Sequence, residues 1–153
     1  MDWRTLFFSF RGRLNRAKYW LAFLIGAAIS AVCILMLAPL LSGVQMGMYG
    51  EGTGGIMAAI ALMVVVLIVV FCSSLAIAFK RLHDRNKSAV WLLLFWLAPS
   101  VLNAIGQSIG GNGAGVFVAL VGAALAIWGL VEIGFLKGTT GPNDYGPDPI
   151  PAG

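Results

Sequence analysis

The residues of this chain that could do chemistry gather in three short segments. They are Arg13 and Arg16 in the first segment, Arg81, His83 and Asp84 in the second, and Asn143, Asp144, Tyr145 and Asp148 in the third. Guanidinium groups suit phosphate or carboxylate oxygens, because their planar donors can bind two oxygens at once. If the fold brings the segments together, this polar cluster could hold an anionic headgroup or a partner protein. The alternative is that its arginines only pair with Asp144 and Asp148 and close the fold.

The same cluster contains the ingredients of a divalent-cation site. His83 offers an imidazole, and Asp84, Asn143, Asp144 and Asp148 offer oxygen ligands. A solvated loop that pairs its charges with neighbouring arginines also explains these residues, and it is strongly favoured over a metal site. We therefore expect neither a metal ion nor a cofactor.

Glu132 is the one ionisable side chain well inside an apolar stretch. An ionised carboxylate in hydrocarbon is costly and needs a partner or a path for water. We expect it to form an ion pair with an arginine of another helix, either Arg81 or Arg16. A proton or cation site is the functional alternative.

The sequence gives little support for an enzyme active site or for a disulfide bond. His83 is the single histidine, and the sequence contains no nucleophile elbow and no phosphate-binding P-loop. Cys33 and Cys72 fall in apolar stretches at depths that differ by about 10 Å at the helical rise per residue, too far for a disulfide. We expect a protein that is not an enzyme.

The elements that must position the polar cluster are apolar helices. Hydrophobic residues make up 59% of the 153-residue chain and the mean hydropathy is +0.91, values typical of integral membrane proteins. Four spans approach or exceed the ~20 residues that cross a bilayer, at residues 19–41, 56–79, 89–105 and 116–136. They predict an all-α, polytopic, four-helix transmembrane bundle forming one domain, 1–153. The third span is short and contains Pro99, so a re-entrant course is its alternative.

Charge predicts the orientation of these spans. All ten Lys and Arg residues lie in residues 1–18, in residues 80–88 or at Lys137, and the connecting segments 42–55 and 106–115 hold none. The positive-inside rule then places both termini and the 80–88 loop in the cytoplasm. Because the basic residues flank apolar spans, the net charge of +4 favours anionic lipid over nucleic acid as a partner.

The two ends of the chain predict different structures. Residues 1–18 mix aromatic and basic side chains, which is typical of a segment lying in the headgroup region. Residues 137–153 are rich in Pro and Gly, so they form either a structured cap on the helices or a free tail, and Tyr145 favours the cap. Small residues such as Gly26 and Gly122 could join helices within one chain or between copies, or to another membrane protein.

Three ordered motifs resemble a known family. They are Phe10-Arg11-Gly12-Arg13-Leu14-Asn15-Arg16 with Tyr19-Trp20, then Arg81-Leu82-His83-Asp84, then Gly138-Thr139 and Gly141-Pro142-Asn143-Asp144-Tyr145-Gly146-Pro147-Asp148-Pro149. With these motifs, the whole chain resembles the small bacterial inner-membrane proteins of the family called domain of unknown function 805. The resemblance implies a helical domain of the bacterial inner (plasma) membrane with these residues on its cytoplasmic face, and it implies no established activity. Glu132 is outside the pattern, and residues 85–88 depart from it.

Together these patterns predict a non-enzymatic membrane module whose cytoplasmic rim binds an anionic phospholipid or a partner protein. A small oligomeric transporter or channel subunit is the alternative function. Since topology places three segments on one face, we also expect Arg81 and Asp84 to contact both residues 11–20 and residues 138–149.

Overall fold

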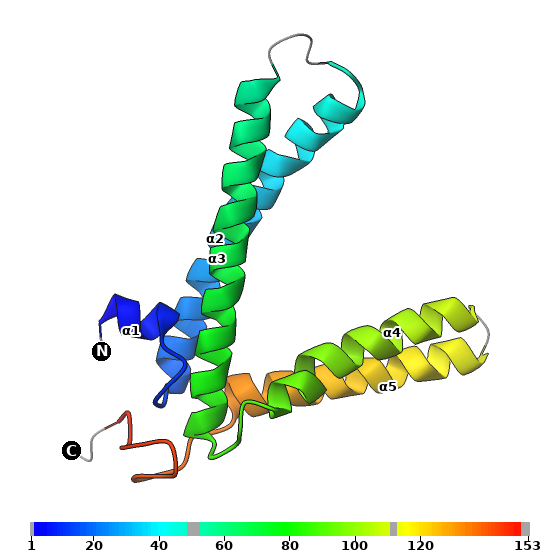
Figure 1. Ribbon diagram of the computed structural model, residues 1–153. Coiled ribbons are helices and arrows are strands. Elements are labelled where there is room, and N and C mark those ends of the chain that lie inside the picture. Colours follow the sequence, from blue (N-terminus) through cyan, green and yellow to red (C-terminus); the bar gives the residue numbers. More distant parts are fainter. Residues whose placement is uncertain (1, 49–52, 111–112, 151–153) are drawn as a thin grey trace.

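A computed structural model describes residues 2–48, 53–110 and 113–150. The prediction of an all-α protein is confirmed (Figure 1). The elements are α1 (Trp3–Phe8), α2 (Arg16–Gln45), α3 (Gly54–Asp84), η1 (Leu93–Leu97), α4 (Ala98–Ile109), α5 (Gly113–Leu130) and η2 (Val131–Phe135), where η denotes a π-helical turn.

Helix lengths agree with a multi-pass membrane protein. Among the described residues, three helices are long and apolar enough to cross a membrane, Arg16–Gln45, Gly54–Asp84 and Gly113–Phe135. The third predicted span corresponds to the shorter apolar helix Leu93–Ile109. Pro99 lies two residues after the π-turn η1, which is closed by the bond from the Ala98 N–H to the Leu93 carbonyl. The distortion expected near this proline therefore takes the form of a wider turn.

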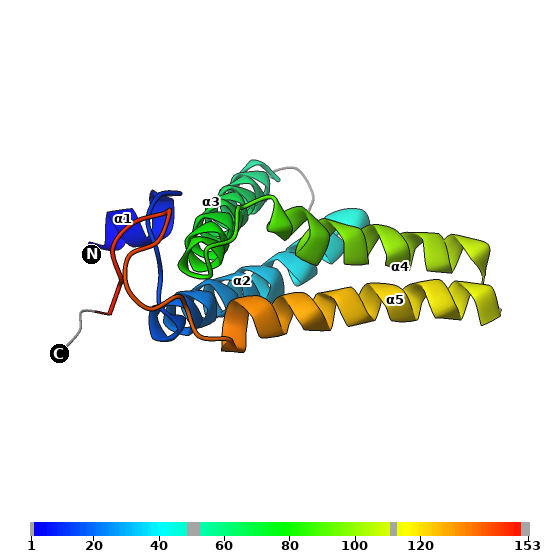
Figure 2. The ribbon, with the colours of Figure 1, turned by 90° about the horizontal axis from the view of Figure 1, so that it is seen from below.

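The helices are arranged as two hairpins that diverge from a common base, α2 with α3 and α4 with α5 (Figures 1 and 2). A single four-helix bundle was the wrong prediction for the described residues, because the hairpins meet mainly where η2 contacts α2 and α3. Apolar side chains gain nothing by leaving lipid for one another, so hydropathy does not dictate which helices pack together.

Glycines decide that α4 packs on α5. Gly115, Gly122 and Gly129 recur every seven residues along α5 and are buried. A Cβ atom on Gly122 would lie 3.1 Å from the Pro99 carbonyl oxygen, and one on Gly129 would lie 2.7 Å from the Phe95 Cβ. The α4 backbone at Pro99 and the Phe95 side chain of η1 approach α5 too closely for side chains at these positions, and close approach at small residues is how helices pack in lipid.

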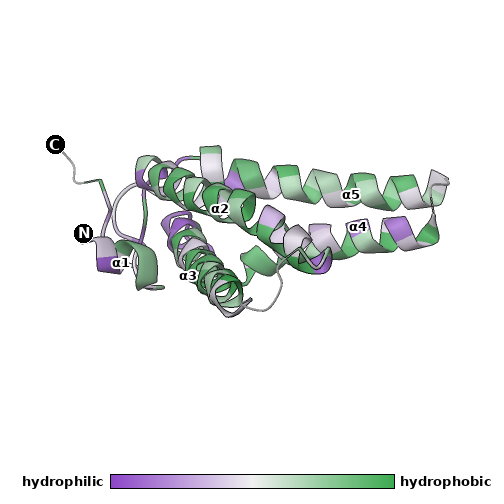
Figure 3. Cartoon of the chain, turned by 90° about the horizontal axis from the view of Figure 1, so that it is seen from above, coloured by the Kyte–Doolittle hydropathy of each residue, from purple (hydrophilic) through white to green (hydrophobic). Residues whose placement is uncertain are grey.

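Hydrophilic residues concentrate at the base, where α1, the start of α2 and the end of α3 meet (Figure 3). Both ends of the described chain lie at this same end of the molecule (Figure 1). The hairpins are hydrophobic along most of their length, and many of their large apolar side chains are exposed. The base is therefore where the polar cluster is assembled.

Candidate functional site

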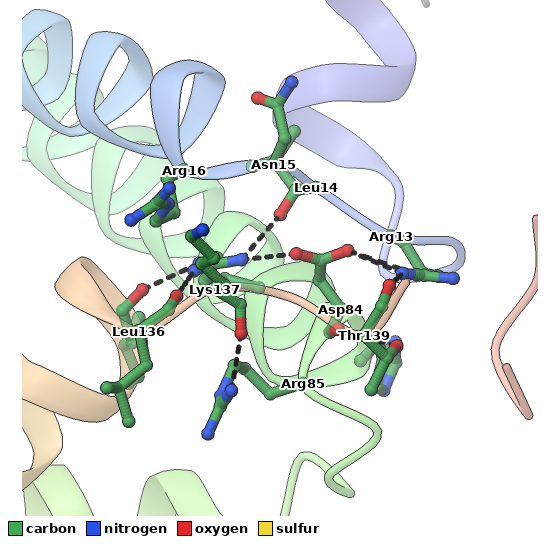
Figure 4. A network of polar contacts seen from close by, with 12 residues as sticks. Arg13, Leu14, Asn15, Arg16, Asp84, Arg85, Leu136, Lys137 and Thr139 are labelled. Carbon is green, nitrogen blue, oxygen red and sulfur yellow. Dashed lines mark hydrogen bonds and ion pairs between the residues drawn. The ribbon is translucent and has the colours of Figure 1, made fainter. Parts of the chain in front are cut away.

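Asp84, the last residue of α3, lies at the centre of the base between two arginines (Figure 4). Its Oδ1 atom is 3.1 Å from both Nε and Nη2 of Arg13, and its Oδ2 atom pairs with Arg81 one helical turn earlier. All three side chains are at most 4% exposed. A Cβ atom on Gly138 would collide with this carboxylate, so glycine is required there. Buried charges of this kind are tolerated because each is paired and hydrogen-bonded.

Arg13 also holds the C-terminal segment. Its guanidinium donates to the carbonyl oxygens of Thr139, Gly141 and Gly146. The Thr139 N–H donates in turn to the Asp84 carbonyl oxygen at 2.8 Å. The predicted contact of Asp84 with both the N-terminal and the C-terminal segments is therefore present. Arg81 reaches the N-terminal segment through the Leu14 carbonyl oxygen at 3.4 Å, but its partners on the C-terminal side, Ile133 and Leu136, precede residues 138–149.

The aromatic rings of His83 and Tyr145 join the end of α3 to the C-terminal segment. The rings stack with centroids 4.0 Å apart and planes 4° from parallel. Asn143 supports the stack by donating from Nδ2 to the His83 carbonyl oxygen at 2.9 Å. Residues 138–149 thus form a structured cap, the alternative that Tyr145 favoured.

Five consecutive carbonyl groups, at the end of η2 and just after it, are each bound by a side chain from elsewhere in the chain. Arg81 binds those of Ile133 (2.8 Å) and Leu136, Trp20 that of Gly134 (3.0 Å), Arg16 that of Phe135 (3.0 Å) and Arg85 that of Lys137. The last carbonyls of a helix have no partner within it, and they carry the negative end of the helix dipole. Cationic side chains from the first hairpin therefore cap the second hairpin and attach it to the first.

Glu132 is bound by residues other than those expected. Its Oε1 atom lies 3.0 Å from Arg85 Nη2 and 3.0 Å from Lys87 Nζ, and the residue is 4% exposed. Pairing with an arginine from outside its own helix is confirmed, but the choice of Arg81 or Arg16 was wrong. The guanidinium groups of Arg81 and Arg16 point at the carbonyls at the end of η2, so the turn after α3 supplies the partners of Glu132.

Asp144 and Asp148 do not pair directly with the cluster's arginines. Asp148 accepts from the N–H groups of Ile150 (2.9 Å) and Gly141 (2.8 Å), and these bonds lower the pKa of its carboxyl group. Asp144 accepts from the Asn86 amide at 3.1 Å. The alternative that the arginines pair with Asp144 and Asp148 is therefore wrong, because Arg13 binds backbone carbonyls of the C-terminal segment instead. Within residues 2–48, 53–110 and 113–150, no group of three or more His, Cys, Asp and Glu side chains could hold a metal ion.

Lys80 links α3 to α1, a role that the sequence analysis did not predict. Its side chain is fully buried, and its Nζ donates to the carbonyl oxygens of Thr5 (2.7 Å) and Leu6 in α1. The available signal was a lysine ending an apolar span beside an amphipathic N-terminal segment, since such a lysine directs its head toward polar groups. Lys80 fastens α1 to α3.

An open pocket of about 530 Å³ lies beside the buried ion pairs. Its lining includes two exposed cations, Arg16 and Lys137, and its inner wall includes Arg81 and Asp84. Figure 4 shows Arg16 and Lys137 on one side of the Asp84 carboxylate and Arg13 on the other. The pocket can therefore present cationic donors to a ligand, while Arg13 is committed to the cap.

Comparisons with known proteins agree with the resemblance noted from the motifs. Residues 7–147 match the family model described as Protein of unknown function (DUF805). The chain is 31% identical to Inner membrane protein YhaH of Escherichia coli (strain K12), with 97% of each chain covered. It is 29% identical to Inner membrane protein YhaI of the same strain, over 92% of this chain and 86% of the relative. No solved structure matches the chain.

Proposed function

Because this chain belongs to the DUF805 family, we propose that it is a multi-pass protein of the bacterial inner membrane that binds the headgroup of an anionic phospholipid without catalysing a reaction. The names of YhaH and YhaI support the membrane assignment. The distribution of Lys and Arg supports an orientation with both termini and the pocket in the cytoplasm. The anionic lipids of the inner leaflet would then face the pocket.

The pocket lined by Arg16 and Lys137 is the observation that carries this proposal. Among the described residues, the Lys137 ammonium has no hydrogen-bond or ion-pair partner, and the Arg16 guanidinium donates to a single group, the Phe135 carbonyl. A guanidinium has more donors than that one bond uses. Arg81 lines the pocket but is buried and bound by protein groups, as is Arg13 on the other side of Asp84, so ligand binding is left to the two exposed cations.

The charges around the pocket favour an anion. Three cations line it, Arg16, Arg81 and Lys137, against the carboxylates of Asp84 and Asp148. Asp84 is neutralised by its two arginines, and Asp148 is engaged by backbone N–H groups. A basic residue at a membrane surface contributes about 1 kcal/mol to the binding of anionic lipid. Loss of one such contact corresponds to an affinity about fivefold lower.

A transporter or channel gains no comparable support. Glu132, the ionisable group on which that function would depend, is closed off by Arg85 and Lys87. Lys87 is held in turn over the Trp91 ring, with Nζ 4.4 Å from the centroid. This arrangement is that of a structural ion pair joining η2 to the turn after α3.

Lipid binding by the purified full chain tests the proposal. We expect native mass spectrometry in detergent to show retention of phosphatidylglycerol in preference to phosphatidylcholine. Lys137→Gln should weaken the retention of phosphatidylglycerol about fivefold, because it removes a pocket cation that makes no described contact in the fold. Lys18→Gln is the matched control, since Lys18 is an exposed cation near the start of α2 that does not line this pocket. Equal retention of the two lipids would overturn the proposal.

A further inference from the structure

We infer that the site takes one whole phospholipid molecule, with its phosphate beside Arg16 and Lys137 and its glycerol and proximal acyl carbons in a second pocket against Trp20 and Phe135. This inference rests on the proposed function and specifies its ligand. The second pocket has a volume of about 390 Å³.

The two pockets form adjoining parts of one surface that changes in polarity. They share three lining residues, Asn15, Arg16 and Ile150. In the first pocket, the lining beyond Arg16 is polar and includes Lys137, Thr139 and Thr140. On the other side it consists of Ala17, Trp20, Gly134 and Phe135. A ligand that fits both pockets has an anionic end and an apolar end.

Helix geometry aligns this polarity with the membrane. Arg16 and Trp20 are four residues apart in α2 and so lie on one face of it. Trp20 is about 6 Å further along the helix axis, in the direction in which α2 becomes continuously apolar. Tryptophan prefers the boundary between headgroups and hydrocarbon. The order of cation, tryptophan and apolar surface is the order of phosphate, glycerol and acyl chain in a leaflet.

The apolar pocket is fixed by the protein's own contacts. The Trp20 indole N–H donates to the Gly134 carbonyl oxygen at 3.0 Å, and its ring meets that of Phe135 edge to face with centroids 5.5 Å apart. A Cβ atom on Gly134 would lie 2.9 Å from the Trp20 ring, so the indole needs glycine at this position. These contacts hold the indole in place, so its surface can serve a ligand without further ordering.

A soluble phosphate would fill the polar pocket and leave the apolar one unused. Phe135 is 56% exposed and Ile150 is 62% exposed, and both border the route from the phosphate position toward the apolar span. Burying such surfaces against acyl carbons favours the lipid, whereas inorganic phosphate or glycerol phosphate gains nothing from them. The lipid should therefore bind more tightly than its isolated headgroup.

Photo-crosslinking can locate the acyl chain. The full chain would be reconstituted in phosphatidylcholine vesicles containing phosphatidylglycerol with a diazirine on the acyl carbons nearest the glycerol. We expect labelling of peptides containing residues 15–20 and 134–137. Ala17→Trp should abolish this labelling by filling the apolar pocket, and Ala28→Trp, at an exposed position further along α2, should leave it intact.

The possible results separate the two proposals. Charge-selective lipid binding with labels spread over α2, α3, α4 and α5 would overturn the two-pocket inference and leave the headgroup site standing. Displacement of the lipid by equimolar glycerol phosphate would also overturn it, because the headgroup alone would then account for binding. Absence of any preference for phosphatidylglycerol would remove both proposals. Labelling at the expected peptides that is weakened in Lys137→Gln would support both.

Discussion

Asp84 shows how one carboxylate can organise a charged site inside a membrane protein. Arg13 and Arg81 come from different parts of the chain and share its two oxygens, so the net charge of this buried group is positive. The excess positive charge is directed at backbone carbonyls of the C-terminal cap and of η2. Removing the carboxylate would leave two guanidinium groups buried without their counter-ion.

We therefore expect Asp84→Asn to destabilise the protein by about 3 kcal/mol, the lower end of what breaking a buried ion pair costs. Thermal unfolding of the purified protein in detergent would measure the change as a lower Tm. Asp144→Asn is the control, because Asp144 is exposed and bonded to Asn86 alone among described side chains, and its effect should stay within about 0.5 kcal/mol. A wild-type Tm for Asp84→Asn would show that the arginines do not depend on this carboxylate.

Asp148 makes the cap sensitive to acid. Hydrogen bonds from the Ile150 and Gly141 N–H groups lower the pKa of its carboxyl below the ordinary value of 3.8. The stabilisation from a lowered carboxyl pKa is present above the ordinary value and is lost as the pH falls through the lower, folded-state value. We expect the amide NMR signals of Gly141 and Ile150 to shift below pH 3.8 and to stop responding in Asp148→Asn. Signals that titrate above that pH in the wild type would contradict this account.

Individual contacts differed in how far the sequence could predict them. Arg81 and Asp84 were expected to meet the two other segments because charge fixed a common face for all three. Asp84 contacts both segments, whereas Arg81 contacts the N-terminal one and binds Leu136 just before residues 138–149. The partners of Glu132 could not be predicted, because they depend on which cations the carbonyls at the end of η2 had already engaged. Which carbonyls lack a helical partner depends on where a helix ends, and hydropathy does not determine that residue.

At the scale of the elements, hydropathy located the apolar helices but did not predict how they pair. Lengths and compositions of the apolar runs are local properties, and the helices fall where they were expected. Pairing is decided by close approach, and the signal for it was the seven-residue spacing of Gly115, Gly122 and Gly129 in α5. The prediction of one bundle treated all four apolar helices as equivalent packing partners.

Gly122→Val tests this packing. The added side chain would meet the Pro99 carbonyl and the Leu102 Cβ, each within 3.2 Å of the new Cβ atom. We expect a loss of about 1–3 kcal/mol, as for overpacked interiors, measured by thermal unfolding. Ala123→Val places the same side chain one residue away at an exposed position and should be nearly neutral. Equal effects of the two substitutions would place the α4–α5 contact elsewhere.

On the scale of the whole molecule, the base is the joint between two otherwise separate hairpins. Its parts are the η2 carbonyls, the cations of the first hairpin and the cap formed by residues 138–149. Away from this joint the hairpins diverge (Figure 1), so their relative orientation depends on a small number of side chains. The proposed lipid site lies directly against this joint, since Arg16 and Arg81 both line the pocket and bind η2.

Arg81 should therefore control the angle between the hairpins without controlling the helices themselves. Arg81→Gln removes the bonds to the Ile133, Leu136 and Leu14 carbonyls and the pair with Asp84. We expect the helical circular dichroism signal to persist, because each hairpin retains its own packing. Spin labels at Val65 in α3 and Leu120 in α5, both exposed, should show a broader distance distribution in pulsed electron paramagnetic resonance.

A label pair within one hairpin provides the control for that experiment. Val101 in α4 and Val116 in α5 are both exposed, and their distance distribution should remain narrow in Arg81→Gln, with Cys33 and Cys72 replaced by serine in every sample. Broadening within the hairpin would mean that Arg81 supports local packing, and no broadening between hairpins would mean that the remaining bonds from Arg16, Trp20 and Arg85 suffice. If added phosphatidylglycerol narrows the distribution between hairpins in the wild type, occupancy of the lipid site and orientation of the hairpins are coupled through the η2 carbonyls.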